Sequence, residues 1–222
     1  MATSFWFLLA FLASLCLLMD GHLFCDADPT DGFTAVQLTE HNFEIQKPYN
    51  IPLDDRYGYN NGVHRMWVCS TDKPLRADST TKPRTEIRIR GYDYSSGVWQ
   101  FEGYGFVPNG TTGTSIMQIH RLDGPATVLM LKVYDDQLKF YSQKLVESNI
   151  YNRWMRVNVI HDVDANKLTV FIDGVQKLEV EGNGHSTFDF KSGVYTQTRV
   201  QIDPSNWMQS NGVYIRVPKK LE

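Results

Sequence analysis

The sequence predicts an all-β protein of the sandwich class. Short runs rich in Val, Ile, Thr, Tyr, Phe and Trp dominate the chain, turn-forming residues recur between them, and few windows longer than ten residues keep a helical period. Of the 222 residues, 42% are hydrophobic and 13% aromatic, which supplies a large core and excludes a disordered chain. A net charge of -3 gives no indication of nucleic-acid binding, and three cysteines are too few for a disulfide scaffold.

The strands follow one another along the chain with turns between them. Asp173-Gly174 predicts a tight hairpin, and residues 162–166 predict a second turn. Pro48–Gly62 and Thr71–Pro83 are polar, rich in turn formers and expected to be long loops. No linker or repeat divides the sequence, so we expect one domain. The predicted strands are Phe33–Leu38, Asn42–Gln46, Val63–Cys69, Arg84–Arg90, Val98–Val107, Ser115–His120, Thr127–Tyr134, Gln137–Ser142, Arg153–His161, Lys167–Ile172, Val175–Val180, Phe188–Gln197 and Val213–Val217.

The N-terminal segment resembles a secretory signal peptide. Phe5–Met19 contains fifteen residues without a charge, which is too short for a membrane-spanning helix and fits the apolar region of a signal peptide. The usual positive flank is missing, and an uncleaved anchor is the less favoured alternative. Cleavage after Ala27 would leave residues 28–222 as the mature domain, and cleavage after Gly21 is the other option. We therefore expect entry into the secretory pathway.

The cleavage site decides the cysteine chemistry. Cleavage after Ala27 leaves Cys69 alone, whereas cleavage after Gly21 leaves Cys25 and Cys69, which can pair in an oxidising compartment. Asn109 begins the N-glycosylation triplet Asn-Gly-Thr in a Gly- and Thr-rich turn, which predicts a surface position.

Period-two alternation in three strands predicts one polar sheet face. Because successive side chains of a strand point to opposite faces, the charged residues of Arg84–Arg90 oppose Ile87 and Ile89. Charged side chains of this density are not expected in an apolar core. If the three strands are neighbours, they form a groove floor with cationic, amide, imidazole and phenol groups. This floor consists of Arg84, Glu86, Arg88, Gln118, His120, Lys191, Tyr195 and Gln197.

The same three strands resemble the alginate-lyase family of polysaccharide lyases. Residues 84–88 read RTEIR, similar to the family's R-(S/T)-E-(L/V)-R; residues 118–120 read QIH, matching Q-(I/V)-H; residues 190–197 read FKSGVYTQ, similar to F-K-A-G-(V/I)-Y-N-Q. Plant members similar to citrate-binding proteins are closer still. Ser192 and Thr196 replace the usual Ala and Asn, and Asp189 replaces a Tyr that often precedes Phe-Lys. The resemblance implies a concanavalin-like β-jelly roll with a concave groove sheet, and a secreted or vacuolar plant protein.

The implied reaction is β-elimination in a 1,4-linked uronate polymer. Arg84 and Arg88 would neutralise the carboxylate with Gln118 as a third donor, which is worth about 3–4 kcal/mol per well-placed donor. His120 has an ordinary pKa near ~6.5 and Tyr195 one near ~10. Either His120 is the base and Tyr195 the acid, or Tyr195 serves as both while His120 neutralises or orients, and the sequence leaves this open. The resemblance thus implies Arg84, Gln118, His120 and Tyr195 as catalytic residues.

A second set of residues would bind the substrate, namely Glu86, Arg88, Lys191 and Gln197. No cofactor is required, and the His, Cys and Asp spacings give no metal signature. The alternative function is a non-catalytic protein of the plant vacuole or cell wall that binds citrate or another carboxylate with the same cations. The expected partner is therefore an acidic polysaccharide or citrate.

Overall fold

The structure, a computed structural model, describes residues 27–123, 127–197 and, for the backbone alone, 211–216. The predicted signal peptide and Cys25 lie outside these residues. The chain divides into two units, Met1–Asp31 and Gly32–Glu222. In the first unit the described residues form a turn in which the Asp31 amide donates to the Asp28 carbonyl, 2.8 Å away. The second unit contains all the described strands.

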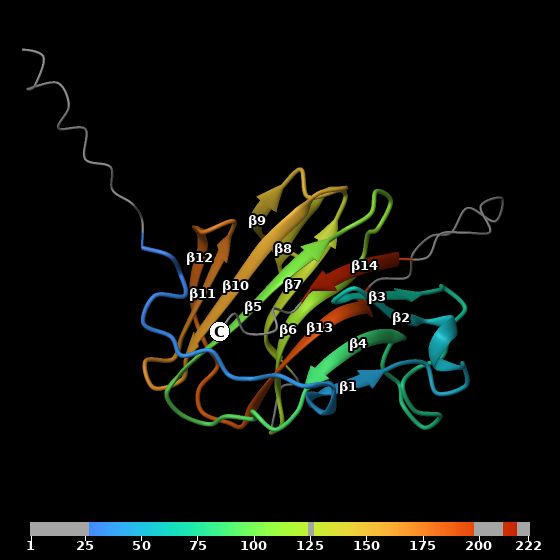
Figure 1. Ribbon diagram of the computed structural model, residues 1–222, viewed down its shortest axis with the longest axis horizontal. Coiled ribbons are helices and arrows are strands. Elements are labelled where there is room, and N and C mark those ends of the chain that lie inside the picture. The colour runs from blue at the N-terminus through green and yellow to red at the C-terminus, as the bar shows by residue number, and fades with distance from the viewer. Residues whose placement is uncertain (1–26, 124–126, 198–210, 217–222) are drawn as a thin grey trace, which may run out of the picture. The chain divides into compact units, whose positions relative to one another are not determined.

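The described part of the second unit contains two antiparallel sheets of seven strands each (Figure 1). This architecture confirms the expected all-β jelly-roll sandwich. The first sheet is ordered β1 (Phe43–Gln46), β4 (Arg84–Ile89), β13 (Phe188–Thr196), β6 (Thr114–Arg121), β7 (Thr127–Tyr134), β8 (Gln137–Phe140) and β9 (Lys144–Ser148). The second sheet is ordered β12 (Val175–Glu181), β11 (Lys167–Ile172), β10 (Trp154–Asp162), β5 (Val98–Phe106), β14 (Asn211–Arg216), β3 (Val63–Val68) and β2 (Tyr57–Asn60).

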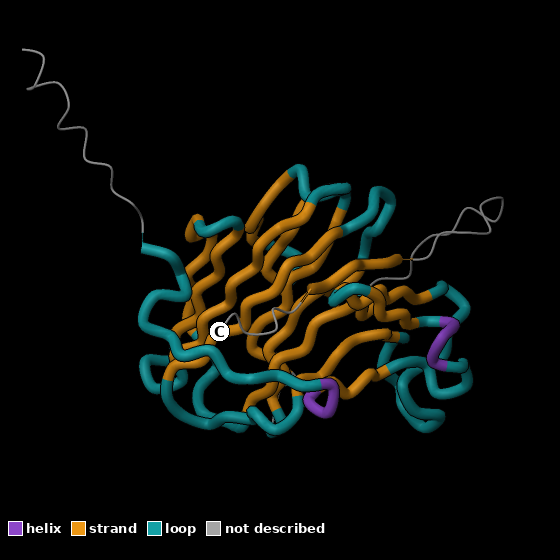
Figure 2. Tube along the Cα trace, viewed as in Figure 1, coloured by secondary structure: helices purple, strands orange, loops and turns teal. Residues whose placement is uncertain are grey.

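Helical structure in the described residues is limited to two short 3₁₀ turns, η1 (Glu40–Asn42) and η2 (Leu53–Asp55), seen against the strands in Figure 2. No helix in the described part is long and apolar enough to cross a membrane. The prediction of a strand at Phe33–Leu38 is wrong, because this segment is largely exposed and joins neither sheet. Two strands were not predicted: β2, inside the expected loop before Gly62, and β9.

The core lies between the sheets and follows the predicted alternation. Ile87 of β4, Ile119 of β6 and Val194 of β13 have no exposed surface. Each lies one residue away from a polar side chain that points to the other face of the first sheet. His161 of β10 also belongs to the core, with 2% exposure, and its Nδ1 lies 3.1 Å from the Tyr94 hydroxyl. Burial lowers the pKa of His161 to about 4, so this imidazole is neutral in the folded protein at neutral pH.

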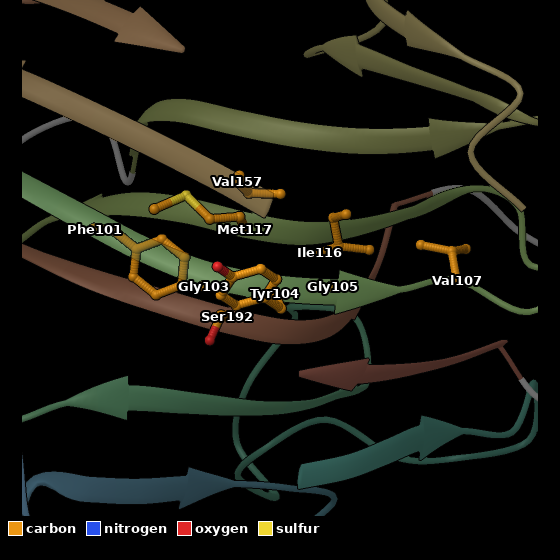
Figure 3. A pocket seen from close by; sticks show the side chains of 9 residues that line it. All are labelled: Phe101, Gly103, Tyr104, Gly105, Val107, Ile116, Met117, Val157 and Ser192. Atoms are coloured by element: carbon orange, nitrogen blue, oxygen red, sulfur yellow. The ribbon is translucent and has the colours of Figure 1, made fainter. Parts of the chain in front are cut away.

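A small cavity of about 20 Å³ lies between β5, β6, β10 and β13 (Figure 3). It has the size of one water molecule and is bordered mostly by apolar groups. Ser192 contributes a buried hydroxyl that has no hydrogen-bond partner among the described residues. This cavity is too small and too apolar for a charged sugar or citrate, so the candidate site must be sought on the opposite face of the first sheet.

β13 occupies the position that makes that face continuous, because it pairs with β4 on one side and β6 on the other. Gly193 allows the close approach to β4. Its φ is +149°, and a Cβ there would lie 2.5 Å from the Cα of Glu86 and from the carbonyl oxygen of Thr85. The pairing of β13 with β6 also shifts register between Ser192 and Tyr195. This bulge sets the position of the last residues of β13, which include Tyr195.

Candidate functional site

The register of β4, β13 and β6 brings the predicted site residues together. Tyr195 lies opposite Arg84, and Lys191 lies opposite Arg88 on one side and Gln118 on the other. The polar face, defined here by Arg84, Glu86, Arg88, Gln118, His120, Asp189, Lys191 and Tyr195, is therefore a single surface of three adjacent strands. The residues come from segments separated by up to about a hundred positions in the chain, as the sequence predicted.

Glu86 links Arg84 on β4 to Gln118 on β6. Its Oε1 accepts a hydrogen bond from Nη1 of Arg84 at 2.9 Å, and its Oε2 accepts one from Nε2 of Gln118 at 2.6 Å. Glu86 and Gln118 are each only 2% exposed. A buried carboxylate with two donors of this kind is strongly held, because the alternative is an unpaired charge in a region of low dielectric. Glu86 thus fixes the guanidinium and the amide relative to each other.

Arg84 also stacks on Tyr195. The guanidinium carbon lies 3.8 Å from the centre of the phenol ring, which is a close cation–π contact. Nε of Arg84 is buried and has no hydrogen-bond partner among the described residues. Arg84, held on one side by Glu86 and on the other by the ring, places its positive charge directly beside the Tyr195 phenol.

The opposite end of the face centres on Asp189, which has no exposed surface. Its Oδ2 lies 3.0 Å from Nδ1 of His120 and 3.2 Å from Nε of Arg88. Arg88 reaches Asp93 as well, at 2.7 Å, and Glu44 at 3.9 Å. Burial lowers the pKa of Arg88, but the charges of Asp189 and Asp93 outweigh burial and raise it. This guanidinium therefore stays charged and is surrounded by acidic groups.

Lys191 lies in the middle of the polar face and is 4% exposed. Its Nζ donates to Oε1 of Gln46, a residue of β1, at 3.2 Å. Burial lowers the pKa of this amine, while the nearby carboxylates of Glu86 and Asp189 act in the opposite direction. Sequence reasoning did not identify Gln46 as part of the face, although it lies directly opposite Glu86 in the pairing of β1 with β4.

Gln197 lies just beyond the end of β13. Its side-chain amide donates to the carbonyl oxygens of Tyr195 and Thr196, both at 3.3 Å, and its backbone amide donates to Gly113. These bonds fold the side chain against its own strand. The structure therefore places Gln197 next to the polar face but shows it bonded to backbone rather than to the other predicted site residues.

The polar face is more buried than the expected groove floor. Glu86, Gln118, Asp189, Lys191 and Arg84 are each exposed by 8% or less. Their mutual pairing explains why charged residues are tolerated at such depth. The His120 side chain is 27% exposed, and Tyr195 is half-buried, so these two groups form the more accessible part of the face. The polar groups that can transfer protons are thus the ones that a ligand reaches most easily.

The electrostatics of the face differ between its two ends. Arg84, Arg88 and Lys191 supply three positive charges, and the buried carboxylates of Glu86 and Asp189 supply two negative ones. The remaining carboxylates, Glu44 and Asp93, both contact Arg88. The end at Arg84 and Tyr195 is therefore the one suited to an additional anion. No group of three or more His, Cys, Asp or Glu side chains in the described part is arranged to hold a metal ion.

Known proteins resemble this chain in sequence and in fold. A citrate-binding protein from Hevea brasiliensis is 52% identical over 216 residues, which cover 96% of this chain and 89% of that protein. The alginate lyase from Corynebacterium sp. has a similar fold, with a TM-score of 0.58 and 18% identity over 72% of this chain and 78% of that one. An alginate lyase from Pseudomonas aeruginosa gives a TM-score of 0.58 and 17% identity over 81% and 98% of the two chains.

The solved structures support the jelly-roll fold alone, because their identity to this chain is low. Family membership rests on the sequence itself. Residues 36–216 match the family described as alginate lyase, and this span includes the whole polar face. The chain therefore belongs to the alginate lyase family.

Proposed function

We propose that this protein is a polysaccharide lyase that cleaves a 1,4-linked uronate polymer by β-elimination. The observation that carries the proposal is the meeting of Arg84, Gln118, His120 and Tyr195 on one face, with the two proton-transferring groups the more accessible. Family membership supports the same reaction class. The proposed substrate is an acidic polysaccharide.

The chemistry requires three functions, and each has a residue on the polar face. The proton next to the uronate carboxylate becomes acidic enough only when that carboxylate is neutralised, which is the role we assign to Arg84 and Gln118. A base removes this proton, and an acid protonates the departing glycosidic oxygen. His120 and Tyr195 are the groups proposed for these two transfers. Glu86 keeps the arginine and the amide in place by accepting a hydrogen bond from each.

Three carboxylates surround Arg88, so Arg84 and Lys191 are the cations of the polar face left for a ligand, which fits one uronate carboxylate per sugar. A citrate ion brings three carboxylates, whereas Arg88 is already surrounded by Asp189, Asp93 and Glu44. The charge balance therefore favours a polyuronate over citrate. The second candidate is a non-catalytic citrate-binding protein, which the name of the 52% identical relative supports. Citrate is therefore tested alongside the polyuronates.

The deciding experiment incubates the purified chain with alginate, polyglucuronate and pectate and follows the unsaturated product by ultraviolet absorbance. Elimination on one of the three supports the lyase, and no reaction on a broad uronan panel contradicts it. Calorimetry with citrate tests the second candidate in parallel. Heat of binding and thermal stabilisation by citrate, together with an absence of elimination, would replace the lyase by the citrate-binding protein.

Two variants separate catalysis from binding. Tyr195→Phe removes only the phenolic hydroxyl, so we expect elimination to fall by about 10²–10⁴-fold while carboxylate binding stays close to that of the parent protein. Arg84→Ala is expected to reduce both. Arg90→Ala is the matched control, because Arg90 directly follows the strand that carries Arg84 but its side chain is 61% exposed. Equal losses in Arg84→Ala and Arg90→Ala would show that general charge, rather than the polar face, attracts the polymer.

We further propose that the protein enters the secretory pathway and reaches the extracellular space, the cell wall or the vacuole. The apolar N-terminal segment and the Asn109 triplet support this route. Asn109 is exposed in the turn before β6, so its side chain is accessible for modification. Expression in a eukaryotic secretory host should give a product that loses mass on glycosidase treatment, and Asn109→Gln should abolish that loss. An unmodified wild-type product would contradict the proposed glycosylation.

A further inference from the structure

Asp189 is the residue of the polar face that the motif comparison leaves without a role. It stands where the resembling sequences often carry Tyr, and it has no exposed surface. An ionised carboxylate at this depth is costly unless donors surround it. Its Oδ2 has two such donors, one from His120 and one from Arg88, whereas Oδ1 has no hydrogen-bond partner among the described residues. Both contacts made by this side chain thus converge on a single oxygen.

The contact between Asp189 and His120 determines which nitrogen of the imidazole carries a proton. An ionised carboxylate only accepts hydrogen bonds, so the nitrogen at 3.0 Å, Nδ1, must be the donor. In the neutral ring Nε2 is then the unprotonated nitrogen, at the edge that points away from Asp189. Among the described residues no hydrogen bond to Nε2 is formed, and the side chain is 27% exposed. The ring therefore presents a proton-accepting nitrogen on its accessible side.

Arg88 has a supporting part in the same arrangement. Asp189 lies between His120 on β6 and Arg88 on β4, with the guanidinium Nε at 3.2 Å. The carboxylate is thereby fixed by a charged donor on one neighbouring strand and by the imidazole on the other. Arg88 is itself held by Asp93 at 2.7 Å, so its charge is used within the protein. The sequence-based expectation that Arg88 binds substrate accounts for none of these contacts.

We propose that Asp189 is a positioning residue that holds His120 with Nε2 available as the proton acceptor, and that Arg88 serves Asp189 rather than the substrate. This inference rests on the lyase function proposed above. In the reaction, the C–H proton beside the uronate carboxylate moves to Nε2 of His120. The electron pair of that bond forms the C=C bond as the glycosidic C–O bond breaks, and the departing oxygen takes the proton of the Tyr195 hydroxyl. The Asp189 carboxylate stabilises the imidazolium that results.

The first test needs no enzymatic activity. Nitrogen-15 spectra of histidine-labelled protein, with the His120 signals assigned from a His120→Gln variant, report which ring nitrogen is protonated. At a pH where the ring is neutral, we expect Nδ1 to be protonated and Nε2 to be free in the wild type. Loss of this preference in Asp189→Ala would support the assignment to Asp189. A wild-type His120 protonated on Nε2 would overturn the proposal.

The second test is kinetic and uses a matched pair of variants. Asp189→Asn keeps the size of the side chain but removes its charge, and we expect kcat to fall by about 10²-fold with KM changed by less than about threefold. Asp93→Asn removes the other short contact of Arg88 without touching His120, and is expected to change kcat by less than about twofold. Both variants are compared with the wild type by thermal unfolding, so that loss of the fold is separated from loss of positioning.

Equal kcat losses in the two variants, or a kcat of Asp189→Asn within threefold of the wild type, would overturn the role of Asp189. Failure of the wild type on every uronan has a different meaning, because it removes the proposed function. In that case the spectra alone decide whether Asp189 orients His120.

Discussion

Gly193→Ala is the substitution for which the structure gives the most direct expectation. Gly193 belongs to β13, an interior strand of the first sheet, and has a φ of +149°, which side chains rarely adopt. An added Cβ would lie 2.5 Å from the Cα of Glu86 and 2.5 Å from the carbonyl oxygen of Thr85, and 2.8 Å from the Cβ of Glu86. These atoms belong to the backbone or lie next to it, so they cannot move away as the end of a flexible side chain would.

The expected cost has two parts. An unfavourable backbone conformation contributes about 1–3 kcal/mol, and overpacking against a fixed neighbour contributes a further amount of about 1–3 kcal/mol. Together they predict a loss of about 2–6 kcal/mol in the free energy of unfolding. For a chain of this length that loss corresponds to a decrease of about 4–24 °C in the melting temperature. Because β4 has to move away from β13, the contacts from Glu86 to Arg84 and Gln118 are expected to weaken as well.

The assay combines thermal unfolding with elimination kinetics on the purified variant. Gly58→Ala is the control, because Gly58 is also a strand residue but has no atom within 4 Å of an added Cβ and no positive φ. We expect Gly58→Ala to melt close to the wild type. If Gly193→Ala melts within about 2 °C of the wild type and of this control, the close approach of β13 to β4 does not have the role described.

Two further predictions concern buried charge and pH. Glu86→Gln removes the charge from a buried ion pair and should destabilise the protein by about 3–5 kcal/mol in urea unfolding. The control Glu179→Gln breaks an exposed pair with Lys167 and should cost less than about 1 kcal/mol. Similar values for both variants would contradict the argument. Since the folded pKa of His161 is about 4 and its ordinary value is 6.5, the unfolded chain binds the extra proton between these values. The stabilisation from the neutral imidazole, about 3 kcal/mol, is therefore present above pH ~6.5 and lost as the pH falls toward ~4. A His161→Gln variant that keeps the same acid dependence of unfolding as the wild type would refute this assignment.

The faces of the strands were predictable from the sequence because alternation is a local property. In β4 the charged residues oppose Ile87 and Ile89, and in β13 Lys191 opposes Phe190, as period two requires. Asp189 shares this parity with Lys191, so its place on the polar face was also available from the sequence. Its contact with His120 was not, because the two residues are 69 positions apart and the register of β13 against β6 is a tertiary property.

The two missed strands have different causes. β2 and β3 are joined by Asn61-Gly62, both with positive φ, which is a strong hairpin signal lying inside a segment that its polar composition assigned to a loop. β9 alternates poorly, with an exposed Leu145 beside a buried Val146, and forms the edge of its sheet. The wrong strand at Phe33–Leu38 shows the converse, because an apolar run forms no strand without a neighbour to pair with.

The position of β13 in the first sheet also has a consequence for biosynthesis. β1 and β4 are joined to β6–β9 only through β13, although β13 is the last of these strands to leave the ribosome. Until about residue 196 has emerged, Arg84 and Gln118 belong to two separate pieces of sheet, and the chain has no assembled polar face. The polar face can therefore be completed only after most of the chain has been synthesised.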